Sequence, residues 1–175
     1  MEKIINNKKF NFRNDILVVS DVDGCITTGQ FIYTTDGKVA KIFSANDHDG
    51  IKLLREYGIE TIFVTADTTG FDITYSRTYK EMNCETLNIN TEQRIIFIKE
   101  ALKKYKKVIY FGDGPNDVKV KKECPEVIFI TPKNGRDKCK LEADFVTHNK
   151  GGESAFVDLA EYIIEKYSYF ILISH

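Results

Sequence analysis

The sequence has no excess of charge of either sign and no long hydrophobic run. Lys and Arg number 25 against 26 Asp and Glu, which gives a formal net charge of −1. This balance argues against a broad surface for nucleic acid or an anionic membrane. No stretch approaches the ~20 apolar residues that span a bilayer, and the polar residues 1–14 lack the apolar segment of a signal peptide. We expect a cytoplasmic protein that binds neither nucleic acid nor membrane.

Several catalytic and metal-binding patterns are also missing. The four cysteines form no C-x-x-C pair and no Cys/His spacing of the zinc type, so we expect reduced thiols. Gly37-Lys38 is not part of a P-loop, because Ile32 stands where the upstream glycine belongs. No Gly-x-Ser-x-Gly sequence is present, and no cysteine is followed six residues on by arginine. These absences leave the acidic residues as the candidates for chemistry.

Short apolar runs alternate with helical patterns along the chain. The 175 residues suit one domain, 1–175. The apolar runs, continuous and rich in β-branched residues, are 16–19, 62–64, 108–111 and 127–130. The helical patterns are 49–57, 91–105, with Thr91 placed to cap its start, and 153–167. Continuous apolar strands in alternation with helices predict an α/β fold, a Rossmann-like doubly wound parallel sheet.

One stretch breaks this alternation. Residues 31–43 have the pattern of a β-hairpin that turns at Asp36-Gly37. This hairpin flap and the C-terminal tail, about 167–175, are both too apolar for free, solvated segments. We expect both to be buried against neighbouring subunits of a closed symmetric oligomer. The alternative is that both fold back on their own subunit.

Two acids follow the first apolar run directly. Asp21-Val22-Asp23-Gly24 comes at the carboxyl end of that strand, the edge where ligands bind in such sheets. The same pattern recurs at Asp47-His48-Asp49-Gly50, which does not follow a buried strand and is expected to start a helix. Context therefore favours the first copy as the functional one, with a plain turn of solvated acids as the alternative.

A third acid, Asp113, lies in the sequence Gly112-Asp113-Gly114-Pro115-Asn116-Asp117 after another strand. Close carboxylates without a cation would repel and raise one another's pKa. Three hard oxygen ligands, with no His or Cys among them, favour Mg²⁺ over zinc. We expect Asp21, Asp23 and Asp113 to form this metal site. Asp117 is either an orienting group behind it or an ordinary residue of a first helical turn.

Two further side chains suit a phosphate. Thr65 ends the second apolar run with a hydroxyl for a phosphate oxygen, and Arg94 lies on the first turn of its predicted helix. An arginine there offers the fixed positive charge that a phosphoryl transition state needs. Alone, each also fits an ordinary strand end or a solvated helix position. Beside the acids, they predict phosphoryl transfer.

Taken in chain order, these motifs resemble the four motifs of the haloacid dehalogenase superfamily, and the short gaps between them resemble its capless group. More closely, residues 16–165 resemble the 3-deoxy-D-manno-octulosonate 8-phosphate phosphatases. The further shared residues are Thr27, Gly29, Phe43, the segment 47–54, Arg77 and Gly151-Gly152.

The resemblance implies a two-step phosphoryl transfer in which Asp21 attacks phosphorus and Asp23 is the general acid and base. It implies that Mg²⁺ is held by the carboxylates of Asp21 and Asp113 and the backbone carbonyl of Asp23. Thr65 and Arg94 would hold phosphate oxygens. The candidates for contacts around the substrate and behind these ligands are Asn46, Arg77, Asn116 and Asp117. A homotetramer active in lipopolysaccharide biosynthesis, with the flap and tail closing a neighbour's site, is implied as well.

The sequence departs from this family at four places. Asn46 stands where the family has Arg, and Ala66-Asp67 where it has Gly-Arg. Gly114 replaces an Asp, and Arg94 a Lys. The first two changes remove positive charge from the expected mouth, so the substrate is either an octulosonate 8-phosphate, a nine-carbon acid 9-phosphate or another sugar phosphate. A receiver-like or non-catalytic module that partners a sugar-activating enzyme is the alternative function.

Overall fold

The central element is a buried strand, β3 (Ile16–Asp21), in the middle of a six-stranded sheet. The computed structural model describes residues 4–5, 8–9 and 15–173, with side chains for 15–167. The strand order is β10-β9-β8-β3-β6-β7, and every neighbouring pair is parallel. The other strands are β6 (Glu60–Thr65), β7 (Glu85–Asn88), β8 (Lys107–Phe111), β9 (Ile128–Thr131) and β10 (Phe145–Val146).

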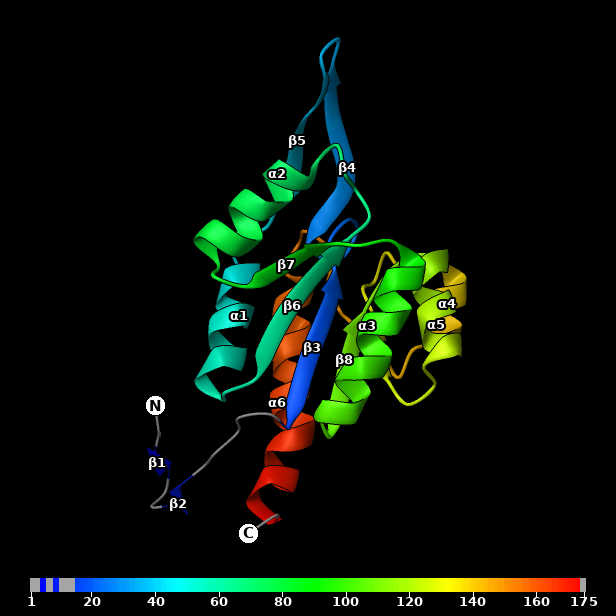
Figure 1. The fold of residues 1–175 in the computed structure, drawn as a ribbon. Coiled ribbons are helices and arrows are strands. Elements are labelled where there is room, and N and C mark those ends of the chain that lie inside the picture. Colours follow the sequence, from blue (N-terminus) through cyan, green and yellow to red (C-terminus); the bar gives the residue numbers. More distant parts are fainter. Residues whose placement is uncertain (1–3, 6–7, 10–14, 174–175) are drawn as a thin grey trace.

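Helices cover both faces of this sheet (Figure 1). On one face lie α1 (Asp47–Glu56) and α6 (Ala155–Ile173), which contact each other. On the other lie α3 (Thr91–Lys104), α4 (Pro115–Glu123) and α5 (Asp137–Glu142). The Rossmann-like, doubly wound arrangement that the sequence predicts is therefore confirmed. A short antiparallel pair, β1 (Ile4–Ile5) and β2 (Lys8–Lys9), lies outside the sheet.

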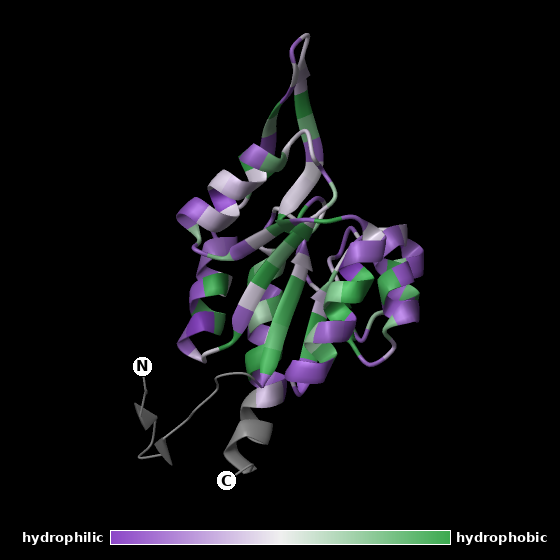
Figure 2. Ribbon diagram, in the orientation of Figure 1, coloured by the Kyte–Doolittle hydropathy of each residue, from purple (hydrophilic) through white to green (hydrophobic). Residues whose placement is uncertain are grey.

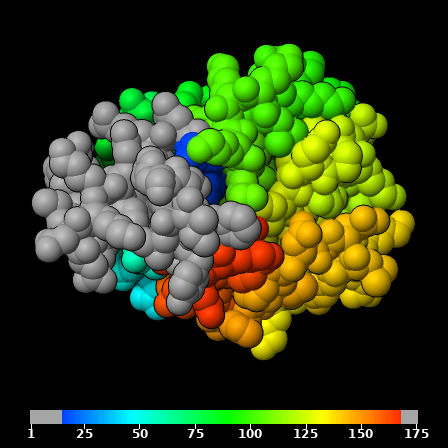
Figure 3. All heavy atoms as spheres, turned by 90° about the horizontal axis from the view of Figure 1, so that it is seen from below, coloured from blue at the N-terminus to red at the C-terminus, as the bar shows by residue number. Residues whose placement is uncertain are grey.

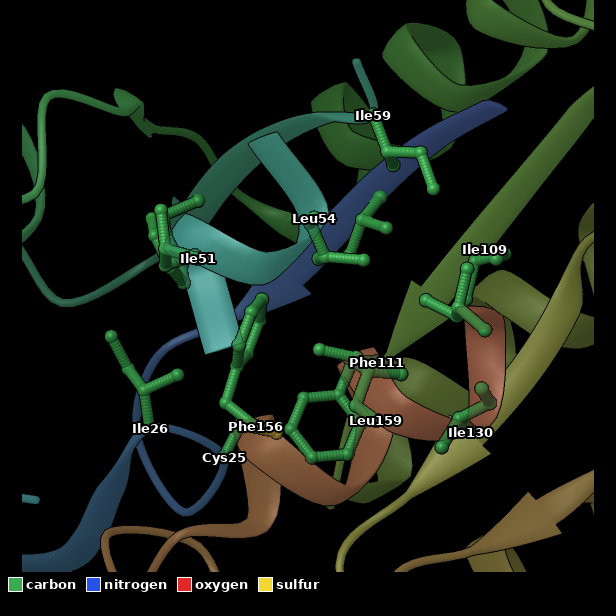
Figure 4. Packing of buried hydrophobic residues seen from close by; sticks show 14 of the residues in the cluster. Cys25, Ile26, Ile51, Leu54, Ile59, Ile109, Phe111, Ile130, Phe156 and Leu159 are labelled. Atoms are coloured by element: carbon green, nitrogen blue, oxygen red, sulfur yellow. The ribbon is translucent and has the colours of Figure 1, made fainter. Parts of the chain in front are cut away.

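Alternating side chains of β3 enter two separate cores. Ile16 and Val18 belong to the cluster under α1 and α6, while Leu17 and Val19 belong to the cluster under α3 and α4. A strand that is covered on both faces must be apolar at every position, which explains the unbroken run. Figure 2 shows the central strands as mainly hydrophobic and the helices as striped. Figure 4 shows how the first core joins the loop after β3, through Cys25 and Ile26, to Phe156 and Leu159 of α6.

The hairpin flap stands away from the sheet at the carboxyl ends of the strands (Figure 1). It consists of β4 (Thr27–Thr34) and β5 (Gly37–Phe43), so it begins four residues earlier than expected. Its two-residue turn is Thr35-Asp36 rather than Asp36-Gly37, with Gly37 at φ +116 as the first residue of β5. Beside the flap lies a helical segment that the sequence does not predict, α2 (Phe71–Tyr75) continued by the π-helix η1 (Ser76–Glu81).

Helix ends also differ from the prediction: α1 begins at Asp47 instead of residue 49, and α6 begins at Ala155 instead of residue 153. The cap of α3 is Asn90 instead of Thr91: its side chain accepts from the backbone N of Gln93, whose side chain accepts in return from the N of Asn90. Helix α6 continues to Ile173, so the predicted tail is a helical extension, and residues 174–175 lie outside the described part. Figure 3 views this end of the molecule, opposite the flap, where α3 and α6 are seen. Among the described helices, none is long and apolar enough to cross a membrane.

Candidate active site

Three of the predicted residues meet at the carboxyl edge of the sheet. Asp21 ends β3 and Thr65 ends β6, and these strands are neighbours. Asp113 follows β8, the neighbour of β3 on its other side. The chain reverses direction across the sheet at β3, so this edge is a topological switch point, where open α/β sheets bind ligands. The fold thus brings together groups that lie 92 residues apart in sequence, from position 21 to position 113.

The loop after β3 is fixed by its own backbone. The carbonyl of Val22 accepts hydrogen bonds from the N–H groups of Cys25, Ile26 and Thr27, at 3.2, 3.0 and 3.1 Å. The Thr27 hydroxyl accepts from the N–H of Gly24 at 3.2 Å and lies 3.4 Å from Asp23 Oδ1. This tight turn holds the two carboxylates of the first motif above the sheet.

Gly24 is required where Asp113 meets this loop. Its φ is +87, a conformation that L side chains rarely adopt. A Cβ there would fall 2.1 Å from Asp113 Oδ2. From behind, Gly151 packs against the carbonyl of Gly24, and Asn134 donates to that carbonyl at 3.0 Å while accepting from the N–H of Gly151 at 2.6 Å. The late glycine therefore supports the loop that carries Asp21 and Asp23.

A buried network connects the first and last motifs. Arg94 Nη2 lies 3.0 Å from Asp21 Oδ1, and its Nη1 lies 2.9 Å from Asp117 Oδ1. Asp117 Oδ2 accepts from the backbone N–H groups of Asp113 and Gly114 at 3.0 and 2.8 Å. Tyr110, which the sequence analysis did not single out, donates to Asp117 Oδ1 at 2.5 Å and accepts from Arg94 at 2.7 Å. Arg94 and Asp117 thus orient the acids at the strand ends.

The raised pKa values of the carboxylates in this cluster indicate that a further cation would stabilise their charged forms. Burial, then the charge of Asp117, raises the pKa of Asp21 well above its usual range, although Arg94 opposes the shift. Burial and the same neighbour raise the pKa of Asp113 to about 7. For Arg94, burial disfavours the charged form, but Tyr110, Asp21 and Asp117 outweigh it and raise its pKa.

Oxygen atoms of Asp21 and Asp113 and the sulfur of Cys25 lie within 4.8 Å of one another. A divalent ion between the two carboxylates would relieve their mutual repulsion, and hard oxygen donors suit Mg²⁺. Asp21 and Asp113 therefore fit a magnesium site, whereas the third predicted acid, Asp23, is not part of this cluster, which has the Cys25 thiol in its place.

The flap adds a group that sequence reasoning missed. Lys41 Nζ lies 2.9 Å from Asp23 Oδ2 and 2.8 Å from Asp67 Oδ2. Lys38 lies 2.5 Å from the same oxygen of Asp67, and these cations hold the pKa of Asp67 below its usual range, against the effect of its burial. The expected loss of positive charge at Asp67 is therefore offset by two lysines of the flap. Thr65, buried beside them, accepts from the N–H of Asp67 at 3.1 Å.

The remaining candidates lie farther from the acids. Asn46 donates to the Ser154 hydroxyl at 3.0 Å, at the junction between the flap and α6. Arg77 donates to the carbonyl of Ser44 at 3.1 Å and pairs with Glu81. Asn116 is exposed at the start of α4. Asn46 and Arg77 thus share one corner of the molecule at the base of the flap.

No protein-family model matches the sequence. A 3-deoxy-D-manno-octulosonate 8-phosphate phosphatase of Haemophilus influenzae is 24% identical over 176 aligned positions, which cover 94% of this chain and 87% of that protein. N-acylneuraminate cytidylyltransferase A of Danio rerio is 25% identical over 155 residues. That match covers 85% of this chain and 34% of the enzyme, so the chain spans about a third of this relative.

Among solved structures, the fold is similar to that of 3-deoxy-D-manno-octulosonate 8-phosphate phosphatase from Moraxella catarrhalis, crystallised with magnesium, phosphate and a KDO molecule. The TM-score is 0.75 at 23% identity, over 94% of this chain and 95% of that one. The sheet, the acids at its edge and these likenesses define the fold of the haloacid dehalogenase superfamily, and no part of 15–173 forms a cap domain. Within that class, the chain resembles the 3-deoxy-D-manno-octulosonate 8-phosphate phosphatases.

Proposed function

We propose that this chain is a Mg²⁺-dependent phosphatase that hydrolyses a small keto-acid sugar phosphate through an aspartyl-phosphate intermediate on Asp21. Its general class is phosphoric monoester hydrolase, an enzyme of the haloacid dehalogenase type. The observation that carries this proposal is the buried cluster in which Arg94 bridges Asp21 and Asp117 while Asp113 packs on Gly24. Such a network of charged groups, largely buried and built from three separate segments of the chain, has no evident purpose in packing alone.

In the first step, a carboxylate oxygen of Asp21 attacks phosphorus and the bond from phosphorus to the sugar oxygen breaks. Asp23 gives a proton to that leaving oxygen. In the second step, Asp23 takes a proton from water, which attacks the phosphorus of the aspartyl phosphate and releases inorganic phosphate. Arg94 keeps Asp21 in place through its 3.0 Å contact, and the Thr65 hydroxyl would hold a phosphate oxygen.

The carboxylates of Asp21 and Asp113 and the backbone carbonyl of Asp23 would hold Mg²⁺. When bound, the ion neutralises negative charge on the phosphoryl group and on the acids around it. Asp117 supports this set because its Oδ2 fixes the backbone of Asp113 and Gly114. The cytoplasmic setting expected from the sequence agrees with a small phosphorylated sugar as substrate.

The names of the two relatives suggest the class of substrate. One acts on an eight-carbon octulosonate phosphate, and the other is named for an N-acylneuraminate, a nine-carbon acid. Asp67 stands where the phosphatases have Arg, but Lys38 and Lys41 balance its charge, so this edge of the site is not made negative. Both acid sugar phosphates therefore stay in the proposal, and an octulosonate would place the enzyme in lipopolysaccharide biosynthesis.

The match to one third of a cytidylyltransferase favours one second candidate, a non-catalytic module that partners a sugar-activating enzyme. Asp23 argues against a long-lived phosphoaspartate of the receiver type, because an acid two residues from the acceptor promotes its hydrolysis.

A panel of phosphate monoesters tests both candidates. Eight- and nine-carbon keto-acid phosphates are compared with hexose phosphates, with and without Mg²⁺, by release of inorganic phosphate. We expect Mg²⁺-dependent turnover with the highest kcat/KM on a keto-acid phosphate. No turnover on any monoester in a folded, Mg²⁺-loaded protein would favour the non-catalytic module, and a preference for simple hexose phosphates would contradict the substrate class.

We further propose a homotetramer in which the flap packs against neighbouring subunits. The flap exposes five large apolar side chains, between 38% and 60% of each, which are Phe31, Ile32, Tyr33, Val39 and Ile42. An apolar strip of this kind on a projecting hairpin supports burial in an assembly.

A further inference from the structure

The ammonium group of Lys41 is completely buried in the described structure. Its side chain has an exposed fraction of 0%, and its three N–H donors meet three acceptors. These are Asp23 Oδ2 at 2.9 Å, Asp67 Oδ2 at 2.8 Å and the Thr74 hydroxyl at 2.9 Å. A buried cation with every donor matched is fixed in position, because each alternative orientation would leave a donor unpaired.

A β-bulge in the flap places this lysine on the side of the acids. Ile32 pairs with Ala40 and the next residue, Tyr33, pairs with Lys38, so Val39 is an extra residue in β5. In a regular strand, residues 38 and 41 would point to opposite faces, since side chains alternate. The bulge shifts this alternation by one, and both lysines reach Asp67. Lys38 also lies 3.8 Å from the centre of the Phe31 ring.

Asp23 has few other contacts that could orient it. Its Oδ1 lies 3.4 Å from the Thr27 hydroxyl, a long hydrogen bond. Its Oδ2 has the shorter, charge-assisted contact to Lys41. The carboxylate that the proposed mechanism uses twice is therefore held mainly from the flap.

We propose that Lys41 is a positioning residue that aims Asp23 at the leaving oxygen, with Asp67 and Thr74 as its anchors. This role rests on the proposed phosphatase function. It gives the flap a catalytic purpose within its own subunit: the hairpin carries the group that orients the general acid. It also explains the acid at position 67, where the resembled family has arginine, since Asp67 is the anchor that both lysines of this flap require.

In the first step, a misaligned Asp23 slows only reactions that need a proton on the leaving group, whereas in the second step it slows hydrolysis of the aspartyl phosphate for every substrate. The constant kcat/KM reports the first step, through departure of the leaving group, and so separates the two. An alkyl phosphate, such as a sugar phosphate, needs that proton, whereas p-nitrophenyl phosphate releases a stable anion. We expect Lys41→Met to lower kcat/KM by about 10²-fold on the preferred sugar phosphate, and far less on p-nitrophenyl phosphate. A uniform structural defect would lower both rates by the same factor.

Lys38→Met is the matched control. Lys38 contacts the same oxygen of Asp67, is equally apolar in its stem and is similarly buried, but it does not contact Asp23. We expect this variant to keep the wild-type ratio of the two rates. Circular dichroism and thermal unfolding establish that each variant is folded. If Lys41→Met does not fold, Asp67→Asn, which leaves the contact between Lys41 and Asp23 but weakens its anchor, should show the same shift of the ratio to a smaller extent.

The double variant completes the test. Once Asp23 is replaced by Asn, Lys41→Met should cause no further change in the ratio of the two rates. An unchanged ratio in folded Lys41→Met, or an additional and independent change in the double variant, would overturn the positioning role. A wild-type protein that turns over neither substrate would instead contradict the proposed function and, with it, this role.

Discussion

Arg94 is the cation that balances the charge of two acids, Asp21 and Asp117. It contacts Asp21 and Asp117 at 3.0 and 2.9 Å, and its exposed fraction is 4%. Loss of the guanidinium would leave two largely buried carboxylates without their cation, and removing one partner of a buried pair costs about 3–5 kcal/mol.

We therefore expect Arg94→Met to lower the free energy of unfolding by this amount and to abolish most phosphatase activity. Arg94→Lys should recover part of both, because a lysine can reach one carboxylate but not hold the two at once. Urea unfolding and kcat/KM measure the two effects. Wild-type stability in Arg94→Met would contradict the network.

Asp113 makes the site sensitive to pH. Its pKa is raised to about 7, mainly by burial and then by Asp117, and Mg²⁺ requires the ionised carboxylate. As the pH falls below about 7, protons compete with the metal, so its apparent affinity should fall about tenfold per pH unit for the proton on Asp113, and more steeply where Asp21, whose pKa is also raised, takes up a second. Calorimetric Mg²⁺ titrations between pH 5.5 and 8 test this, roughly spanning the pKa.

Asp113→Asn serves as the comparison in this titration. The variant should bind Mg²⁺ more weakly and with less dependence on pH. An affinity that is constant across this range in the wild-type protein would contradict the raised pKa.

At the scale of elements, the junction of α1 and α6 contains a buried acid. Asp47, the first residue of α1, accepts from the N–H of Phe156 in the first turn of α6 at 3.1 Å, and its Oδ2 has no hydrogen-bond partner. Burial raises its pKa to about 7, against the hydrogen bond from Phe156 and the charge of Arg77. The folded protein therefore holds this proton where the unfolded chain has lost it.

A raised carboxyl pKa stabilises the fold at low pH, and that stability is lost as the pH rises through about 7. We expect the free energy of unfolding to fall by about 1.4 kcal/mol between pH 6 and pH 8 on this account. Asp47→Asn should remove that decrease. Denaturant unfolding of the two proteins is compared at saturating Mg²⁺, which suppresses the contribution of Asp113. Equal pH dependence of the free energy of unfolding in both proteins would show that Asp47 is not its cause.

The sequence predicts an element well where a single physical factor, such as burial on both faces of the sheet, determines its structure. Ile16 to Val19 form a buried strand because helices cover both faces of the sheet, and the unbroken apolar run indicates this burial. The acids Asp21 and Asp113 follow from their positions after such strands. The start of α3 was wrong by one residue because Asn90 and Thr91 are both good caps, and only the reciprocal bond with Gln93 decides between them.

Other parts depend on contacts distant in sequence. Lys41 meets Asp23, 18 residues away, and Thr74, 33 residues away, and only a bulge at Val39 turns it to that side. Spacing alone would place Lys38 and Lys41 on opposite faces. The sequence indicates Tyr110 only as one more apolar residue of a buried strand, and the contact of its hydroxyl with Asp117 depends on where the fold places α4. No local sequence pattern predicts these contacts.

For the whole molecule, the assembly decides whether the flap is covered. In the single chain, Tyr33 is 60% exposed and Ile32 52%, and we expect a tetramer to bury them. Sedimentation velocity at micromolar concentration should give a tetramer, and replacing Ile32 and Tyr33 together by Ser should give smaller species. A fully active wild-type monomer would contradict shared sites.

A deletion tests the end of the chain separately. Removing the residues beyond Tyr167 shortens α6 after its last described core residue. Since Tyr167 and the core before it remain, the protein should stay folded while activity or substrate preference changes. Unchanged kinetics in the truncated protein would remove the C-terminal segment from any role at the site.

The proposed function depends above all on Asp21, at the edge of β3, being the nucleophile. The most direct measurement is to trap the covalent intermediate: borohydride reduces an aspartyl phosphate to homoserine, which mass spectrometry locates in the sequence. During turnover with Mg²⁺, we predict homoserine at position 21 and none at position 23, with none in Asp21→Asn. Homoserine at another acid, or full turnover by a folded Asp21→Asn variant, would contradict the account.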